Sequence, residues 1–386
     1  IFGLIRADGL AQAVDRVGRL SERDLDWQRR IIRSAILARY QRMSSNQAPE
    51  GPSAALRRPG RPPGRSSFAL SSESARDAAH TIAVELERDA IWDGRGNRTW
   101  LTLSLLPDAE RLQLGLIGDG LYDGRAGLAA FAGLLRAGAA RPDGEAMFAP
   151  ALQRLTGADP YARLRYLRDL GLGWGGLGGI LRMIDLQRSS ISTSLLSAAQ
   201  EAALLTSAAE LIGRDPYGDL LSGVAGLVAP VARRHRAESD QATARLLAAA
   251  AERLVSTQLD EGGWPSPIAS RPLTGLAHGA AGMGLALLEA GTALGRSDYV
   301  EAAARAFAYE HRHLAADAGN WPDFRTHALG PGGEPGFMVA WCHGAAGIGL
   351  ARARALDLAP DHPDAAVWRH ELEVAMATVA ACPLGP

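Results

Sequence analysis

The residue types best suited to chemistry lie in two nearly identical segments. Leu276–Gly291 reads LAHGAAGMGLALLEAG, and Trp341–Leu356 reads WCHGAAGIGLARARAL. Each places a His-Gly-Ala-Ala-Gly core before an apolar stretch at helical spacing, and the second places Cys342 directly before its histidine. Thiols and imidazoles bind zinc, and imidazoles also transfer protons. The repeated turn therefore predicts a ring of helices with a metal at its centre.

Cys342 is the first candidate metal ligand. A buried free cysteine is commonly inert packing, but this one lies at a glycine turn, directly before His343. A catalytic zinc site needs three protein ligands and one open position, and Cys342 would supply one of them. His343 is a doubtful second ligand, because neighbouring side chains rarely both reach one ion.

His278 lies in the turn one repeat earlier and is the candidate general acid or base. A lone histidine can also cap a helix or fill a polar niche, but its matching location on a shared cavity favours catalysis. Asp219 lies four residues before Gly223, near the mouth of the preceding repeat. Its carboxylate can orient an imidazole and hold it in one tautomer, or serve only as a helix N-cap. Both roles for Asp219 stay open.

The other polar and aromatic residues near the turns receive no chemical role. Asp123 in YDGRAG and Trp174 in GWGGLG occupy comparable mouth positions, and we assign both a structural role. The remaining histidines lack ligand spacing. We expect solvated side chains at His235, His311, His313, His327 and His362, and helical positions without a role at His80 and His370.

Five Gly-x-x-Gly turns, each followed by an apolar run, must position these side chains. They lie at Gly124–Gly127, Gly176–Gly179, Gly223–Gly226, Gly279–Gly282 and Gly344–Gly347. Their spacing is that of a helical hairpin with its loops, so the sequence predicts five repeats of an α-hairpin. Glycine at a helix start lets the backbone turn tightly and approach its neighbours. We predict an all-α fold, an α/α toroid with these turns at the mouth of a central cavity. An open solenoid is the alternative.

The remaining segments predict a helical start, a linker and a few regular elements. Residues 1–42 show a helical apolar stripe, and Ser21 with Asp24 can cap a second helix. Residues 43–66 contain five prolines and three glycines and predict a linker without regular structure. Further predicted elements are helices over Ala75–Ile91 and Ala242–Leu259 and a short β-hairpin of Thr99–Leu103 with Leu112–Leu116.

Composition excludes several classes of function. The formal net charge of −1 gives no reason to expect nucleic acid or an anionic membrane surface as a partner. All 41 basic residues are arginine, which excludes a Walker-A loop, a pyridoxal Schiff base and a lysine-dependent kinase. The two cysteines do not form a disulfide framework, so we expect a reducing cytoplasm. No apolar run is long enough to span a bilayer.

Together these motifs resemble those of the lanthionine cyclases (LanC-like proteins). The segments that carry the resemblance are LYDGRAGLAAF, GLGWGGLGGILRMI, DLLSGVAGL, LTGLAHGAAGMGLAL and FMVAWCHGAAGIGLARARAL. More narrowly, the chain resembles the C-terminal cyclase half of class II lanthipeptide synthetases. Residues 1–42 are similar to the tail of the dehydratase half that precedes it. The resemblance implies a dehydratase remnant over 1–42, a linker over 43–66 and a cyclase domain, incomplete at its C-terminus, over 67–386.

The resemblance also implies a cofactor and a reaction. In the family, Zn²⁺ is held by a cysteine that matches Cys342 and by a later Cys-His pair. Cys382 is followed by Pro383, so that pair is expected beyond residue 386. The implied substrate is a lanthipeptide precursor, whose zinc-activated cysteine thiol adds to dehydroalanine or dehydrobutyrine to form a thioether ring. His278, supported by Asp219, would then protonate the α-carbon. Some cyclases carry an arginine shortly before the zinc cysteine, but residues 337–340 contain none.

Two other functions stay open. The chain is a candidate for a cyclase-like scaffold that binds peptides or thiols without catalysis, because one thiolate and an adjacent imidazole hold zinc weakly. Another α/α-barrel enzyme, such as a glycosidase, would need two facing carboxylates. No repeat mouth shows such an acidic pair.

Overall fold

The computed structural model describes residues 9–18, 20–47, 71–92, 97–106, 111–135, 144–190, 196–330 and 332–382. The chain divides into two compact units. The first comprises Ile1–Gly51 and Trp100–Ile117, and the second comprises Pro52–Thr99 and Gly118–Pro386. Among the described residues, no helix has the length and apolar character needed to cross a membrane.

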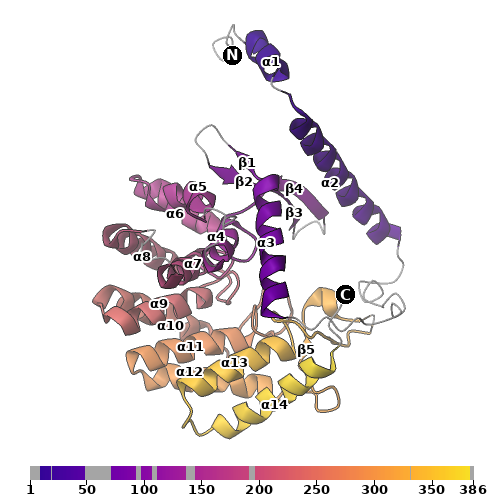
Figure 1. The fold of residues 1–386 in the computed structure, drawn as a ribbon. Coiled ribbons are helices and arrows are strands. Elements are labelled where there is room, and N and C mark those ends of the chain that lie inside the picture. Colours follow the sequence, from indigo (N-terminus) through magenta and orange to yellow (C-terminus); the bar gives the residue numbers. More distant parts are fainter. Residues whose placement is uncertain are drawn as a thin grey trace. The chain divides into compact units, whose positions relative to one another are not determined.

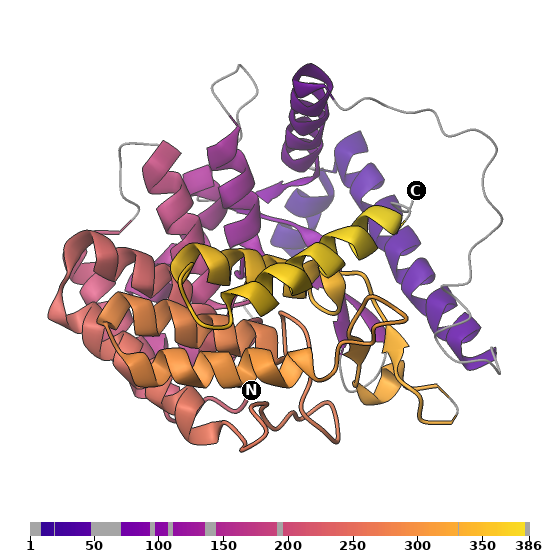
Figure 2. The ribbon, with the colours of Figure 1, turned by 90° about the horizontal axis from the view of Figure 1, so that it is seen from below.

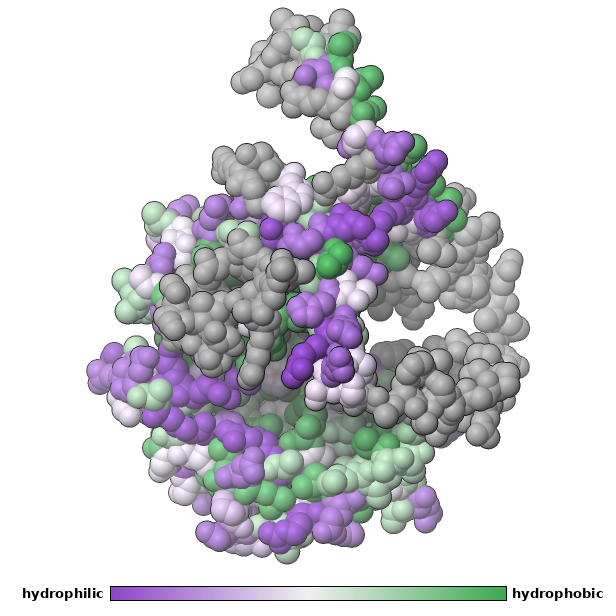
Figure 3. All heavy atoms as spheres, in the orientation of Figure 1, coloured by the Kyte–Doolittle hydropathy of each residue, from purple (hydrophilic) through white to green (hydrophobic). Residues whose placement is uncertain are grey.

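The first unit contains two helices and a β-hairpin (Figure 1). The elements are α1 (Gly9–Gly18), α2 (Glu22–Gln47), β3 (Leu101–Leu106) and β4 (Arg111–Leu116). The antiparallel strands pair Leu101 with Leu116, which confirms the predicted hairpin, and α2 packs on β4. Figure 3 shows hydrophobic residues of α1 at the surface.

Helix α2 has the predicted cap but a later end than predicted. The Ser21 amide donates to the Asp24 carboxylate at 2.8 Å, and the Asp24 amide donates to Ser21 Oγ at 3.3 Å. The helix continues to Gln47, so the prediction that 43–66 lacks regular structure is wrong at its start. Residues 43–47 contain neither proline nor glycine, so nothing in them stops the helix. The rest of the predicted linker lies outside the described residues.

The second unit is a toroid of helical hairpins. Its helices are α3 (Ser72–Asp89), α4 (Arg125–Leu134), α5 (Gly144–Thr156), α6 (Pro160–Leu170), α7 (Leu177–Ser190), α8 (Ala198–Ile212), α9 (Ala225–Glu238), α10 (Gln241–Thr257), α11 (Ala280–Leu294), α12 (Ser297–His311), η1 (Thr326–Ala328), α13 (Ala345–Leu358) and α14 (Ala365–Ala381). Two short antiparallel pairs, which the sequence did not predict, join β1 (Ile91–Trp92) to β2 (Arg98–Thr99) and β5 (Pro322–Asp323) to β6 (Gly336–Phe337).

Five of these helices begin at the predicted glycine turns. They are α4, α7, α9, α11 and α13, and each packs on the next in that order. Helices α10, α12 and α14 pack on α9, α11 and α13 as their hairpin partners. Figures 1 and 2 show the hairpins following one another around the unit in chain order. The predicted all-α array of hairpins is therefore confirmed.

The second glycine of a turn is required because the preceding turn lies against it. A Cβ added there would meet the Cβ of a leucine that lies three residues before the first glycine of the preceding turn. The pairs are Gly179 with Leu121, Gly282 with Leu220 and Gly347 with Leu276, at 2.5, 3.1 and 2.8 Å. All three distances are shorter than ordinary van der Waals contact. The motif thus sets how closely successive turns approach.

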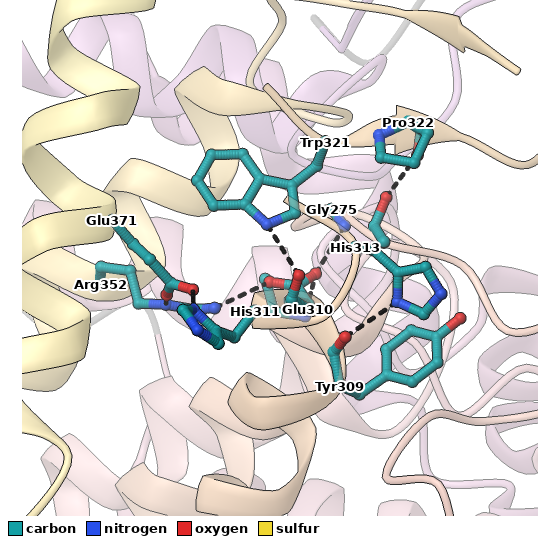
Figure 4. Close-up of polar contacts among 11 residues, drawn as sticks. Gly275, Tyr309, Glu310, His311, His313, Trp321, Pro322, Arg352 and Glu371 are labelled. Carbon is teal, nitrogen blue, oxygen red and sulfur yellow. Dashed lines mark hydrogen bonds and ion pairs between the residues drawn. The ribbon is translucent and has the colours of Figure 1, made fainter. Parts of the chain in front are cut away.

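Three of the histidines expected to be solvated, His235, His313 and His362, are instead partly buried by local partners, whereas His311 is exposed as expected. His235 Nδ1 lies 3.1 Å from Thr243 Oγ1, and His362 stacks on Trp368. His311 and His313 have partners that are shown in Figure 4: the Glu371 carboxylate at 3.0 Å and the Tyr309 carbonyl at 2.9 Å. The His327 side chain lies outside the described residues.

Candidate active site

Backbone hydrogen bonds join the glycine turns into a continuous series. The Trp174 amide donates to the Leu220 carbonyl at 2.9 Å, the Leu220 amide to the Ala277 carbonyl at 3.1 Å, and the Ala277 amide to the Cys342 carbonyl at 3.1 Å. In each link a turn donates one backbone N–H to a carbonyl of the following turn, and the four turns before α7, α9, α11 and α13 are joined in this way. The candidate catalytic residues are direct sequence neighbours of this backbone series, so the main chain holds them in adjoining positions.

Asp219 and His278 are brought into direct contact. The His278 Nδ1 lies 2.7 Å from Asp219 Oδ2. The other carboxylate oxygen accepts the backbone N–H groups of Ser222 at 2.6 Å and Gly223 at 3.1 Å. Asp219 is only 6% exposed. Asp219 therefore orients the imidazole and closes its own turn. It is not a helix N-cap, because Val224 holds that position of α9 without a side-chain hydrogen bond.

The hydrogen bond to Asp219 selects one tautomer of His278. A carboxylate only accepts hydrogen bonds, so Nδ1 carries the proton in the contact with Asp219. The other ring nitrogen, Nε2, is then left to exchange a proton with a substrate. This arrangement of a carboxylate behind an imidazole is suited to general acid–base chemistry.

The turn of α13 places a second imidazole against the first. The rings of His278 and His343 are stacked, with centroids 5.8 Å apart and planes inclined by 29°. Cys342, which precedes His343, is a half-buried free thiol. Because His343 corresponds to His278 in the repeat, Cys342 corresponds to Ala277. The structure therefore brings together Asp219, His278 and His343. Cys342 directly precedes His343, and its backbone carbonyl accepts the amide of Ala277, the residue before His278.

An ion pair that the sequence did not reveal borders this turn. Arg325 donates to both carboxylate oxygens of Asp323, and its Nη2 lies 3.0 Å from the sulfur of Met338. Burial works to raise the pKa of Asp323. The hydrogen bonds from Arg325 and the electrostatic attraction of the nearby His343 outweigh burial and lower that pKa. Met338 belongs to the 337–340 stretch, where no arginine occurs. Arg325 reaches this stretch from outside the repeated turns, which is why repeat comparison missed it.

Glu310 of α12 binds the backbone of the turn that carries His278, and Figure 4 shows its contact with Gly275 of that turn. Its buried carboxylate accepts the N–H groups of Gly275 at 2.8 Å and Ala281 at 3.0 Å. Arg352 donates to its other oxygen at 3.2 Å. Burial raises the pKa of Glu310 to about 7, although Arg352 works in the opposite direction. Sequence reasoning missed Glu310 because it lies on a hairpin partner helix, away from any motif.

The described residues supply part of a metal site at most. Cys342 offers a thiolate, the ligand type that zinc favours. Within the described ranges, no group of three His, Cys, Asp or Glu side chains lies close enough together to hold a metal ion. A three-ligand zinc site at Cys342 would therefore need donors from outside these ranges.

Comparison with known proteins finds a matching family. The family model described as lanthionine synthetase C-like protein matches residues 116–379. Among solved structures, the chain is similar to nisin cyclase, with 16% sequence identity over 68% of this chain and 70% of that chain and a TM-score of 0.40. A comparison with curated proteins finds no match.

Proposed function

We propose a thioether-forming activity for this chain, which belongs to the lanthionine synthetase C-like family. In the proposed reaction, the thiol of a peptide cysteine adds to a dehydroalanine or dehydrobutyrine of the same precursor peptide. The product is a lanthionine-type ring. The observation that carries the proposal is the 2.7 Å contact between Asp219 and His278, in a turn that adjoins the Cys342-His343 turn.

His278 would move the proton in this reaction. With Nδ1 held by Asp219, Nε2 would accept the proton of the substrate thiol. The sulfur would then bond to the β-carbon of the dehydro residue while the double-bond electrons move toward the carbonyl as an enolate. The same nitrogen would return the proton to the α-carbon. One S–C bond forms and one C=C bond becomes single, so no other reactant is needed.

Zinc is the proposed cofactor, with Cys342 as one of its ligands. When bound, the metal would stabilise the substrate sulfur as a thiolate. The role of Cys342 would be to fix that ion beside the turn of His278. The resemblance of residues 1–42 to a dehydratase tail further supports a class II synthetase, in which a dehydratase half of the same chain prepares the precursor peptide.

Ring formation and zinc content, measured on the same variants, test this proposal. The purified protein, extended past Pro386 to include the expected Cys-His pair, is mixed with a dehydrated precursor peptide. The loss of free thiol is followed by alkylation and mass spectrometry. We expect His278→Asn to slow cyclisation by about 10²–10⁴-fold, the usual contribution of a positioned acid or base. Asp219→Asn should also slow it, because an amide can donate to Nδ1 and select the wrong tautomer.

Cys382 provides a matched control for the metal. Cys342→Ser should lose both zinc and activity, whereas Cys382→Ser changes an exposed thiol and should keep both. A Cys342→Ser protein that retains full zinc occupancy would contradict the ligand assignment. If the unaltered zinc-loaded chain binds the peptide without accelerating ring formation, the chain is a peptide-binding scaffold.

A further inference from the structure

Three aromatic side chains from three different turns gather next to the candidate active site. The ring centroids of Tyr122 and Trp341 lie 5.5 Å apart, and those of Trp174 and Trp341 lie 6.4 Å apart with planes inclined by only 23°. The three residues precede α4, α7 and α13. These residues, the aromatic cluster, connect the first and second glycine turns directly to the fifth.

Two rings of the aromatic cluster are packed against buried residues, and the third is exposed to solvent. Trp174 and Trp341 are partly buried and pack against an apolar group that includes Leu220 and Leu276. Tyr122 is 62% exposed. An aromatic ring held in place by buried neighbours presents a preformed apolar surface to a ligand, at little cost in conformational entropy.

The aromatic cluster adjoins the candidate active site along the backbone. Trp341 is bonded to Cys342, and Trp174 begins the series of backbone hydrogen bonds that ends at the Cys342 carbonyl. Consecutive residues of an extended peptide are about 3.8 Å apart between Cα atoms. If the substrate cysteine is bound beside Cys342, the neighbouring residue of the substrate peptide can therefore reach Trp341, which directly precedes Cys342 in this chain.

We propose that the aromatic cluster binds a bulky apolar side chain adjacent to the reacting cysteine of the substrate peptide. This inference rests on the proposed function, because it takes a cysteine-containing peptide as the ligand of the neighbouring site. The exposed carboxylate of Asp123, next to Tyr122, disfavours an acidic residue at the same peptide position by charge repulsion. At the peptide position adjacent to the cysteine, the aromatic cluster thus favours a large apolar side chain such as leucine over a small polar one such as serine or an acidic one such as aspartate.

Binding of unmodified peptides tests the selection without any reaction. Two fluorescently labelled precursor peptides differ only in Leu or Ser beside the cysteine, and both lack dehydro residues. Fluorescence anisotropy should show that the unaltered chain prefers the Leu peptide. Tyr122→Ala should weaken binding of that peptide by about twofold to tenfold and leave the Ser peptide unchanged. Tyr122→Phe keeps the ring and should keep the preference.

Tyr161 provides the matched control. It is an 82% exposed tyrosine at the start of α6, outside the glycine turns, so Tyr161→Ala should change neither affinity. The inference is overturned if the unaltered chain binds neither peptide, if it shows no preference, or if Tyr122→Ala leaves the preference intact. A chain that shows the preference but forms no rings from dehydrated peptide contradicts the proposed function alone.

Discussion

At the scale of single residues, Glu310 combines a structural and an electrostatic task. One oxygen of its carboxylate accepts two backbone N–H groups of the His278 turn, and the other accepts Arg352. Arg352 also pairs with Glu371 of α14, whose second oxygen contacts His311. Two buried acids thus share one buried arginine, so a proton retained on Glu310 reduces the repulsion between them.

The protonation of Glu310 predicts a pH-dependent stability. Its pKa is about 7 in the folded chain, above its ordinary value of 4.5. Between these values the folded state holds a proton that the unfolded state has lost. The stabilisation is therefore fully present below pH 4.5 and is lost as the pH rises from 4.5 through 7, by on the order of 3 kcal/mol. Urea unfolding at a series of pH values should show this loss in the unaltered chain.

Glu310→Gln should reduce that loss, because its side chain cannot titrate. Glu301→Gln removes an exposed acid from the same helix and should leave the pH dependence unchanged. If the free energy of unfolding changes with pH in the same way in the unaltered chain and in Glu310→Gln, Glu310 is not the group responsible for the loss of stability.

At the scale of elements, the glycine turns were predictable and the contacts between them were not. Glycine spacing and helical period are local properties, so all five turns could be placed from the sequence. Helix α3 begins earlier than predicted because Ser71 and Ser74 form a capping box. Arg325 and Glu310 could not be assigned to the site, because their partners lie in other elements and no repeat marks them.

The same turns predict the effect of adding a single methyl group. A Cβ at Gly282 would clash with the Leu276 carbonyl oxygen and crowd the Leu220 side chain. Gly282→Ala should therefore lower the free energy of unfolding by about 1–3 kcal/mol or more, as overpacking does. Thermal unfolding measures this. Gly213→Ala is the control: its Cβ meets no atom within 4 Å, and its backbone is already helical at φ −65°. Equal melting temperatures for the two variants would contradict the packing argument.

At the scale of the whole molecule, the two units differ in how much they bury. No described side chain of α1 or α2 is buried, and Val14 and Val17 of α1 are exposed. In contrast, α11 has a continuous run of buried residues from Ala280 to Gly284 and packs on α9, α12 and α13. Helical stability comes mainly from packing of an apolar face, so the two units should differ in local stability.

Hydrogen exchange should reveal this difference. We expect the amides of α2 to exchange through local opening, well before those of α11 and α12, whose protection should approach that of global unfolding. Mass spectrometry of peptic fragments after timed deuteration measures both regions in one sample. Comparable protection of α2 and α11 would show that the first unit gains its stability from contacts beyond its own helices and hairpin.

The amide-to-carbonyl links between turns have a consequence for how this scaffold can change. They use only main-chain atoms, so they do not depend on which side chain occupies each link: tryptophan, leucine, alanine and cysteine all serve in one chain. A substitution at such a position therefore changes the side chain while the backbone hydrogen bonds between the turns are kept. Ala277 and Cys342 already illustrate the exchange, because the same link carries a methyl group in one turn and a thiol in the next. New chemistry can thus arise at the mouth of the ring without a new fold.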